Sequence, residues 1–255
     1  MLQVYQCEDS IEGIFTAIYK IYEDKNQHKE CRVSIDGELF LLAEYRPVEA
    51  DAERAMKVIR TLRRCFGEED YLTICYALAS RDPDKADAVY HAVAYGLDRK
   101  VIQGRLFDNL AEPYLHKVFS LARGASNESC HIKGFLRFEE AQQGFLYASI
   151  GPKNNILTFV MPHFADRFPM EHFVIHDDVR GLFGVHPAGK QWYLVSGNQV
   201  LEEGDFTPSP AEEEYQRLFR HFCRSIAIED RKNLKLQQNL LPLRFREYMV
   251  EFDSR

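Results

Sequence analysis

The chain has 255 residues, of which 45% are hydrophobic and 28% charged, a composition typical of a globular protein with a packed core and not of a disordered or fibrous one. Its 32 Lys and Arg residues against 39 Asp and Glu give a net charge of −7, which excludes a uniformly basic protein that coats nucleic acid by charge alone. No run approaches the roughly 18 apolar residues of a membrane span, and no signal-peptide pattern opens the chain. We therefore expect a cytoplasmic protein without a membrane partner.

The six cysteines do not form the Cys-x-x-Cys pairs that structural zinc and iron–sulfur sites use. His172 and His176 are four residues apart in an expected strand, which separates them by roughly 13 Å, too far for one ion. We therefore expect no metal and no cofactor.

The first elements are a strand over residues 2–7 and an amphipathic helix over 11–22, with Asp9 and Glu12 as its capping box. Alternating apolar residues between Val33 and Leu41, around a turn at Asp36-Gly37, predict a β-hairpin.

A helical pattern follows from Asp51 to about Arg123, with Gly67 and Gly124 as expected helix ends. At Lys133 the period changes from 3.6 to 2, which predicts two antiparallel strands over 133–138 and 145–150.

The rest of the chain alternates between helix and strand. A helix over 156–168 contains Pro162, which predicts a kink or two shorter pieces. Ser209, Pro210 and Glu212 are typical of a helix start, and a long C-terminal helix is expected after them. Further strands are expected near Glu171–His176, Arg180–His186 and Gln191–Val195.

These elements predict an α+β fold, an antiparallel sheet with a helical layer and a long C-terminal helix. No Gly/Ser-rich linker interrupts the chain, which favours one domain over residues 1–255. If a boundary divides it, we expect it near 123–130, between a mainly helical part (1–125) and the sheet with the C-terminal helix (126–255).

Residues 215–246 carry eight Lys and Arg against Glu229 and Asp230, a local charge of +6. Such a segment can contact phosphates, although a solvated helix face explains the same charges. The cations that we expect to contact nucleic acid here are Arg231, Lys232, Lys235 and Arg244.

The expected strand over 133–138 places Lys133, Phe135 and Arg137 on one face, with Phe145 and Tyr147 beside them. A basic and aromatic sheet surface binds single strands by stacking bases on rings. Burial of these rings under helices is the alternative.

A second group of polar residues lies further on. His163 and Arg167 share one helix face, and His176, Asp177 and Arg180 follow at a strand end. Together they could bind a phosphorylated substrate and move protons on it. Structural ion pairs between the same carboxylates and arginines are the alternative.

Several of these motifs recur in a fixed order. They are Asp9 to Gly13, Lys133 to Phe138, His163 to Phe168, Ile175 to Arg180, and Arg231-Lys232-Asn233 before Pro242-Leu243-Arg244. This order resembles a bacterial family of DNA-metabolism proteins that is defined by a domain of unknown function. Its members are encoded beside a radical-SAM protein of DNA modification or repair, and related domains follow uracil-DNA-glycosylase-like domains.

The resemblance implies a DNA-associated role and a radical-SAM protein as partner, but it brings no established catalytic residues. Cys130 and His131 stand where the family often has a histidine and a basic residue. The chain itself lacks the Cys-x-x-x-Cys-x-x-Cys motif of radical-SAM enzymes.

Three hypotheses remain open at this point. The first is a DNA repair or modification accessory that binds nucleic acid and works with a radical-SAM partner. The second is an enzyme that acts on a nucleotide or damaged base, with the His163 to Arg180 residues in one pocket. The third is a protein-interaction module without catalysis.

Overall fold

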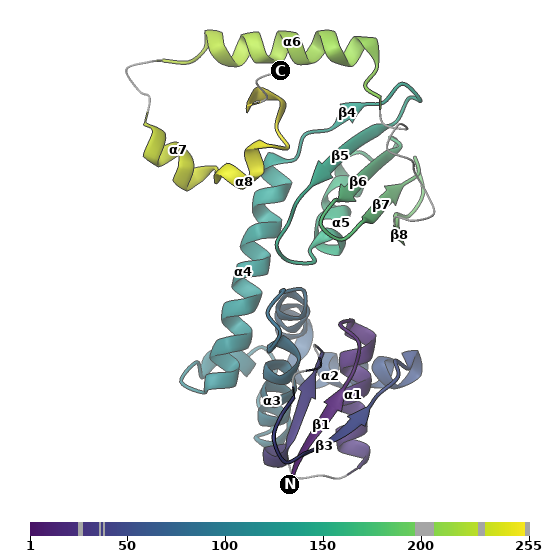
Figure 1. Cartoon of the computed structure of the whole chain (residues 1–255), viewed down its shortest axis with the longest axis vertical. Coiled ribbons are helices and arrows are strands. Elements are labelled where there is room, and N and C mark those ends of the chain that lie inside the picture. The colour runs from purple at the N-terminus through teal and green to yellow at the C-terminus, as the bar shows by residue number, and fades with distance from the viewer. Residues whose placement is uncertain (25–27, 36, 38, 197–206, 229–232, 253–255) are drawn as a thin grey trace. The chain divides into compact units, whose positions relative to one another are not determined.

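The computed structural model describes residues 1–24, 28–35, 37, 39–196, 207–228 and 233–252. The chain divides into two compact units, Met1–Ser126 (unit 1) and Asn127–Arg255 (unit 2). Both combine helices with a sheet, so the α+β class predicted from sequence is confirmed (Figure 1). Helix α4 (Pro113–Phe135) begins in unit 1 and ends in unit 2.

Unit 1 is built on a parallel three-stranded sheet in the order β2-β1-β3. The predicted first strand and first helix are confirmed, and they bury Val4, Tyr5 and Phe15 completely. The elements of this unit before α4 are β1 (Leu2–Gln6), α1 (Ile11–Glu23), η1 (His28–Glu30), β2 (Cys31–Ser34), β3 (Ala43–Pro47), α2 (Ala52–Leu78), α3 (Lys85–Asp98) and η2 (Leu106–Asp108).

Three local signals in unit 1 concern where its helices begin and end. Ser10, not Asp9, caps α1, because its side chain accepts a hydrogen bond from the N–H of Gly13. Gly67 does break α2, with a φ of 85° that favours glycine. Gly124 ends no helix, since α4 continues past it.

The predicted hairpin between Val33 and Leu41 is wrong. Strands β2 and β3 each pair with β1, in parallel, and not with each other. Leu39 and Leu41 are 84% and 95% exposed, so the alternating apolar residues there do not form a buried face. Of the expected turn, Asp36 lies outside the described residues.

Unit 2 contains a five-stranded sheet in the order β4-β5-β6-β7-β8. The pair β5–β6 is parallel and its neighbours are antiparallel. The prediction of a purely antiparallel sheet is therefore wrong here, as it is for unit 1. The sheet elements are β4 (Glu139–Glu140), β5 (Leu146–Ile150), α5 (Leu157–Arg167), β6 (Phe173–Asp177), β7 (Leu182–His186) and β8 (Tyr193–Ser196).

Helix α5 joins the parallel strands β5 and β6 and remains one helix despite Pro162. It packs on one face of the sheet, where the side chain of Met161 fills the space that a Cβ at Gly184 would take. Phe173 and Ile175 of β6 are buried in the same core.

The strand predicted over 133–138 is wrong, because residues up to Phe135 form the last turn of α4. The ring of Phe135 stacks on His131, one helical turn earlier, and both rings contact Phe245. Packing against this distant residue favours the helix over the strand that the local alternation indicates.

The long C-terminal helix is also not found. Helix α6 (Pro210–Ser225) begins as predicted, with Ser209 accepting the N–H of Glu212, but it ends at Ser225. The last elements are short: α7 (Leu234–Leu240), α8 (Leu243–Arg246) and η5 (Val250–Phe252). None of the described helices has the length and apolar character needed to cross a bilayer.

Candidate functional site

The two faces of the unit 2 sheet differ in chemistry. Side chains alternate along a strand, so Ile175 and its partner Gly184 face α5, while His176 points to the opposite face. On β5, Tyr147 and Ser149 lie on that opposite face, with Ser149 in register with His176. The face away from α5 is therefore polar at its centre.

A chain of hydrogen bonds connects these three side chains. The hydroxyl of Tyr147 lies 2.9 Å from Ser149 Oγ and 3.1 Å from His176 Nδ1. The His176 ring stacks on Phe183 at 4.2 Å between centroids. Burial lowers the pKa of His176, although the nearby charges of Asp178 and Asp177 act in the opposite direction, so burial favours the neutral ring.

The start of α6 and the C-terminal segment close a pocket over this face. The backbone N–H of Ser209 donates to the carbonyl of Glu140, and the N–H of Glu140 donates to the Glu212 carboxylate. Arg137 forms an ion pair of 2.8 Å with Glu251. The hydrogen bonds hold the α6 wall against the sheet, and the ion pair holds the C-terminal wall.

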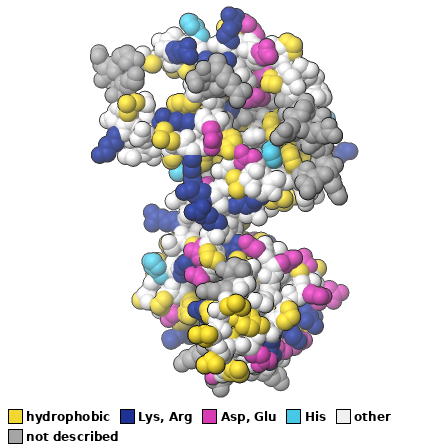
Figure 2. All heavy atoms as spheres, in the orientation of Figure 1, with side chains coloured by type: hydrophobic (Ala, Val, Ile, Leu, Met, Phe, Trp, Pro, Cys, Tyr) yellow, Lys and Arg dark blue, Asp and Glu magenta, His cyan; other side chains and the backbone are white. Residues whose placement is uncertain are grey.

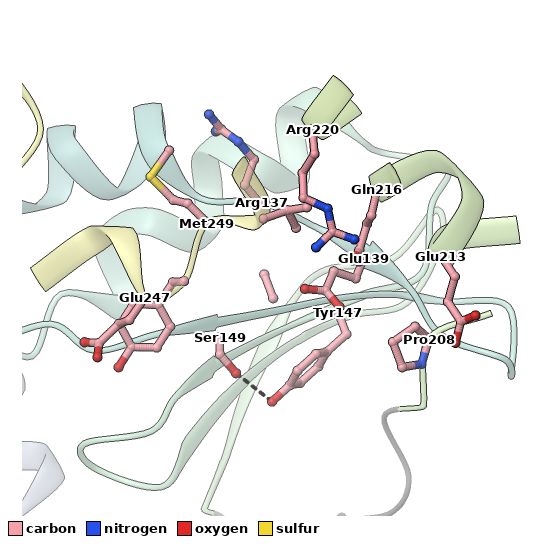
Figure 3. Close-up of a pocket in the computed structure, with 13 residues that line it drawn as sticks. Arg137, Glu139, Tyr147, Ser149, Pro208, Glu213, Gln216, Arg220, Glu247 and Met249 are labelled. Atoms are coloured by element: carbon pink, nitrogen blue, oxygen red, sulfur yellow. Dashed lines mark hydrogen bonds between the residues drawn. The ribbon is translucent and has the colours of Figure 1, made fainter. Parts of the chain in front are cut away.

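The pocket has a volume of about 590 Å³, within the range of small-molecule sites. Tyr147 and Ser149 contribute one side, and Gln216 and Arg220 project from α6 toward them (Figure 3). The remaining wall residues are Arg137, Glu139, Ala148, Pro208, Glu213, Glu247, Tyr248, Met249 and Val250.

Arg220 is the middle member of a row on α6. Arg217, Arg220 and Arg224 are three and four residues apart and so share one helix face. Arg217 pairs with Glu214 on the surface, where both side chains are more than half exposed. Among the described residues, neither Arg220 nor Arg224 has an ion pair.

A network around the buried Glu128 carboxylate fixes the C-terminal segment. The Glu128 carboxylate, 2% exposed, accepts the backbone N–H groups of Lys153 and Asn154 and the Asn154 side-chain amide. Arg244 Nη1 lies 3.0 Å from the same carboxylate. Arg244, expected to contact nucleic acid, is therefore paired with a buried carboxylate, while its own side chain is partly exposed.

The five residues expected to share a catalytic pocket are divided between the two faces of the sheet. His163 and Arg167 lie on the exposed side of α5, whereas His176 lies on the face away from that helix. Asp177 points the other way from His176 and does not orient it. Its buried carboxylate pairs with Arg180 at 3.0 Å, and Arg180 also donates to the carbonyls of Pro152 and Lys153.

The residues expected to bind nucleic acid are also dispersed. Lys133 and Phe135 belong to α4, and Arg137 Nη1 donates to carbonyls at the C-terminal end of that helix. Lys235 is exposed on α7. Arg231 and Lys232 lie outside the described residues. On the face drawn in Figure 2, basic side chains lie among acidic ones.

The sequence patterns do not predict Ser149, Gln216 or Arg220 as site residues. The alternation of β5 placed Tyr147 on one face, and Ser149 follows by the same period of two. Arg220 was counted only within the basic segment. In the part of the chain that the structure describes, no group of three or more His, Cys, Asp or Glu side chains could hold a metal ion.

The fold and the site together define an α+β protein with a polar pocket on one face of a mixed sheet, covered by α6 and the C-terminal segment. Residues 83–251 match the family of the domain of unknown function DUF4130. The chain belongs to this family, and the matched region contains the whole pocket. No curated protein and no solved structure matches the chain.

Proposed function

We propose that the protein binds DNA through unit 2 and acts as an accessory of DNA repair or modification beside a radical-SAM protein. The observation that carries this proposal is the arginine row on α6, whose middle member, Arg220, projects into the pocket. The family resemblance to proteins of DNA metabolism supports the same role.

The row suits a phosphate backbone. Arginines at 217, 220 and 224 repeat along about two turns of helix, and the exposed guanidinium groups of Arg217 and Arg224 can each neutralise one phosphate and release counterions. The ion pair of Arg217 with Glu214 is an exposed surface pair that contributes little to stability, so a phosphate can replace the carboxylate.

The test is fluorescence anisotropy of the whole protein with single-stranded, duplex and uracil-containing DNA over a series of salt concentrations. We expect log affinity to fall linearly with log salt, and Arg224→Glu to weaken all three DNAs alike and to reduce the slope by about one. Arg60→Glu is the matched control, because Arg60 is exposed on α2 in unit 1. Absence of binding at low salt, or equal losses in both variants, would contradict the proposal.

A protein partner is supported by a second feature of α6. Tyr215, Leu218, Phe222 and Ile226 form an apolar stripe, and each is more than half exposed. We expect the radical-SAM protein to co-purify with the chain, and Leu218→Asp to abolish this without changing DNA affinity. Retention of the partner by this variant would argue against the stripe, and co-purification without DNA binding would favour a pure interaction module.

An enzyme acting on a nucleotide or damaged base is the second candidate function. The Ser149, Tyr147 and His176 chain favours it, because a neutral histidine at the end of such a chain can accept a proton from the pocket. Incubation with oligonucleotides that carry damaged bases should then release product, and His176→Asn should stop the release. Equal turnover by this variant would remove the histidine from the mechanism.

A further inference from the structure

We infer that the pocket of unit 2 takes one unpaired nucleobase that carries an exocyclic amino group, stacked against Tyr147. This inference rests on the proposed DNA binding and names what enters the pocket. Four observations support it: the charge of the pocket walls, the hydrogen-bonding groups that line them, the fixed aromatic ring, and the position of the arginine row.

The charges of the walls exclude a simple ion as the preferred ligand. Arg137 is paired with Glu251, which leaves Arg220 as the cation that projects into a pocket also lined by Glu139, Glu213 and Glu247. Carboxylates would repel a phosphate deep in the pocket, and Arg220 would repel a cation. A neutral ligand with both donors and acceptors satisfies both kinds of wall.

Nucleobases have this combination of groups. An exocyclic amino group donates to a carboxylate, and ring nitrogens or carbonyls accept from Arg220 or from the amide of Gln216. The Gln216 amide nitrogen already donates to Glu212 at 3.1 Å, which orients the side chain. Thymine and uracil lack the amino group and would leave a carboxylate without its donor, so they should bind more weakly.

The ring of Tyr147 is held in place for stacking. Its hydroxyl lies within hydrogen-bonding distance of both Ser149 and His176, so the side chain loses little freedom when a base is added. Tyr147 lines the pocket, and Figure 3 shows its ring below Arg220 with the hydroxyl directed toward Ser149. A base stacked there leaves its sugar and phosphate outside the pocket, for the exposed arginines of the same helix, Arg217 and Arg224, to contact.

The experiment uses the whole protein and strands of twelve abasic nucleotides, with either no base or one base at the centre, in the anisotropy assay at fixed salt. Guanine, adenine or cytosine should raise affinity about tenfold over the base-free strand, and thymine should raise it less. Tyr147→Phe should keep the gain because the ring remains. Tyr147→Leu should lose it.

Glu213→Gln is the second variant, because its exposed side chain can change without loss of folding. We expect it to remove the preference for amino-bearing bases over thymine. Equal affinity for strands with and without a base, while salt-dependent binding persists, would overturn the inference and leave the proposed function. Absence of binding to every strand would overturn both, and an unchanged gain in Tyr147→Leu and Glu213→Gln together would place the base elsewhere.

Discussion

Replacing Glu128 by alanine should destabilise unit 2 strongly, since this carboxylate joins α4, the loop after β5 and the C-terminal segment. It accepts two backbone N–H groups, from Lys153 and Asn154, and the amide of Asn154. These three donors are only part-buried, so leaving each without a partner costs about 1 kcal/mol, the lower end of the usual range. Arg244 is 32% exposed and can return to water, so its lost ion pair adds little. We expect a total of about 3 kcal/mol.

For a unit of this size, about 3 kcal/mol corresponds to a melting temperature roughly 10 °C lower. Trp192 is the one tryptophan of the chain and lies in unit 2, so its fluorescence during heating follows that unit alone. Glu214→Ala is the matched control, because its carboxylate forms a surface pair with Arg217 and should shift the midpoint by less than about 2 °C. A midpoint for Glu128→Ala within that same margin would refute the assignment of this network as a structural support.

Two further predictions concern close packing and pH. Gly151→Ala should lower the Trp192 midpoint, because a Cβ there would overlap the Tyr248 hydroxyl, whereas Gly134→Ala, with open space around it, should not. In unit 1, burial raises the pKa of Asp87 to about 6 and lowers that of His91 to about 4. Between about pH 4 and 6, Asp87 therefore holds a proton in the folded state that it lacks in the unfolded state, and His91 lacks one that it holds when unfolded. Asp87 thus makes stability fall as pH rises, and His91 makes it rise. Over this window stability should therefore rise with pH in Asp87→Asn and fall in His91→Gln. Amide exchange of α3 in urea measures this stability. Equal slopes in the two variants would contradict the two pKa shifts.

Elements with a strong local signal could be predicted from sequence. The apolar stripe of α1 and the Ser209 cap of α6 each depend on residues within a few positions, and both helices begin where expected. The last turn of α4 could not be predicted, because the Phe135 ring is held by Phe245, which lies more than one hundred residues further along the chain. The alternation at Lys133 to Phe138 satisfied the strand pattern without any partner strand to pair with.

The candidate site was only partly predictable for a related reason. His176 and Asp177 are adjacent in sequence, and a histidine beside a carboxylate indicates a catalytic pair only when both side chains reach one space. In a strand they cannot, because neighbours point to opposite faces. Asp177 therefore supports the turn to Arg180. His176 contacts Tyr147 on the other face.

The same alternation determines which residues of the C-terminal segment can function with the sheet. Helix α6 lies over the face that holds Tyr147 and Ser149, so its inward residues, Gln216 and Arg220, become part of the pocket (Figure 3). Arg244, with an equal charge, is paired with Glu128 instead. The net charge of residues 215–246 therefore overstates how many of their cations can bind a ligand. Position on α6, more than the number of cations, determines which arginines can meet a ligand.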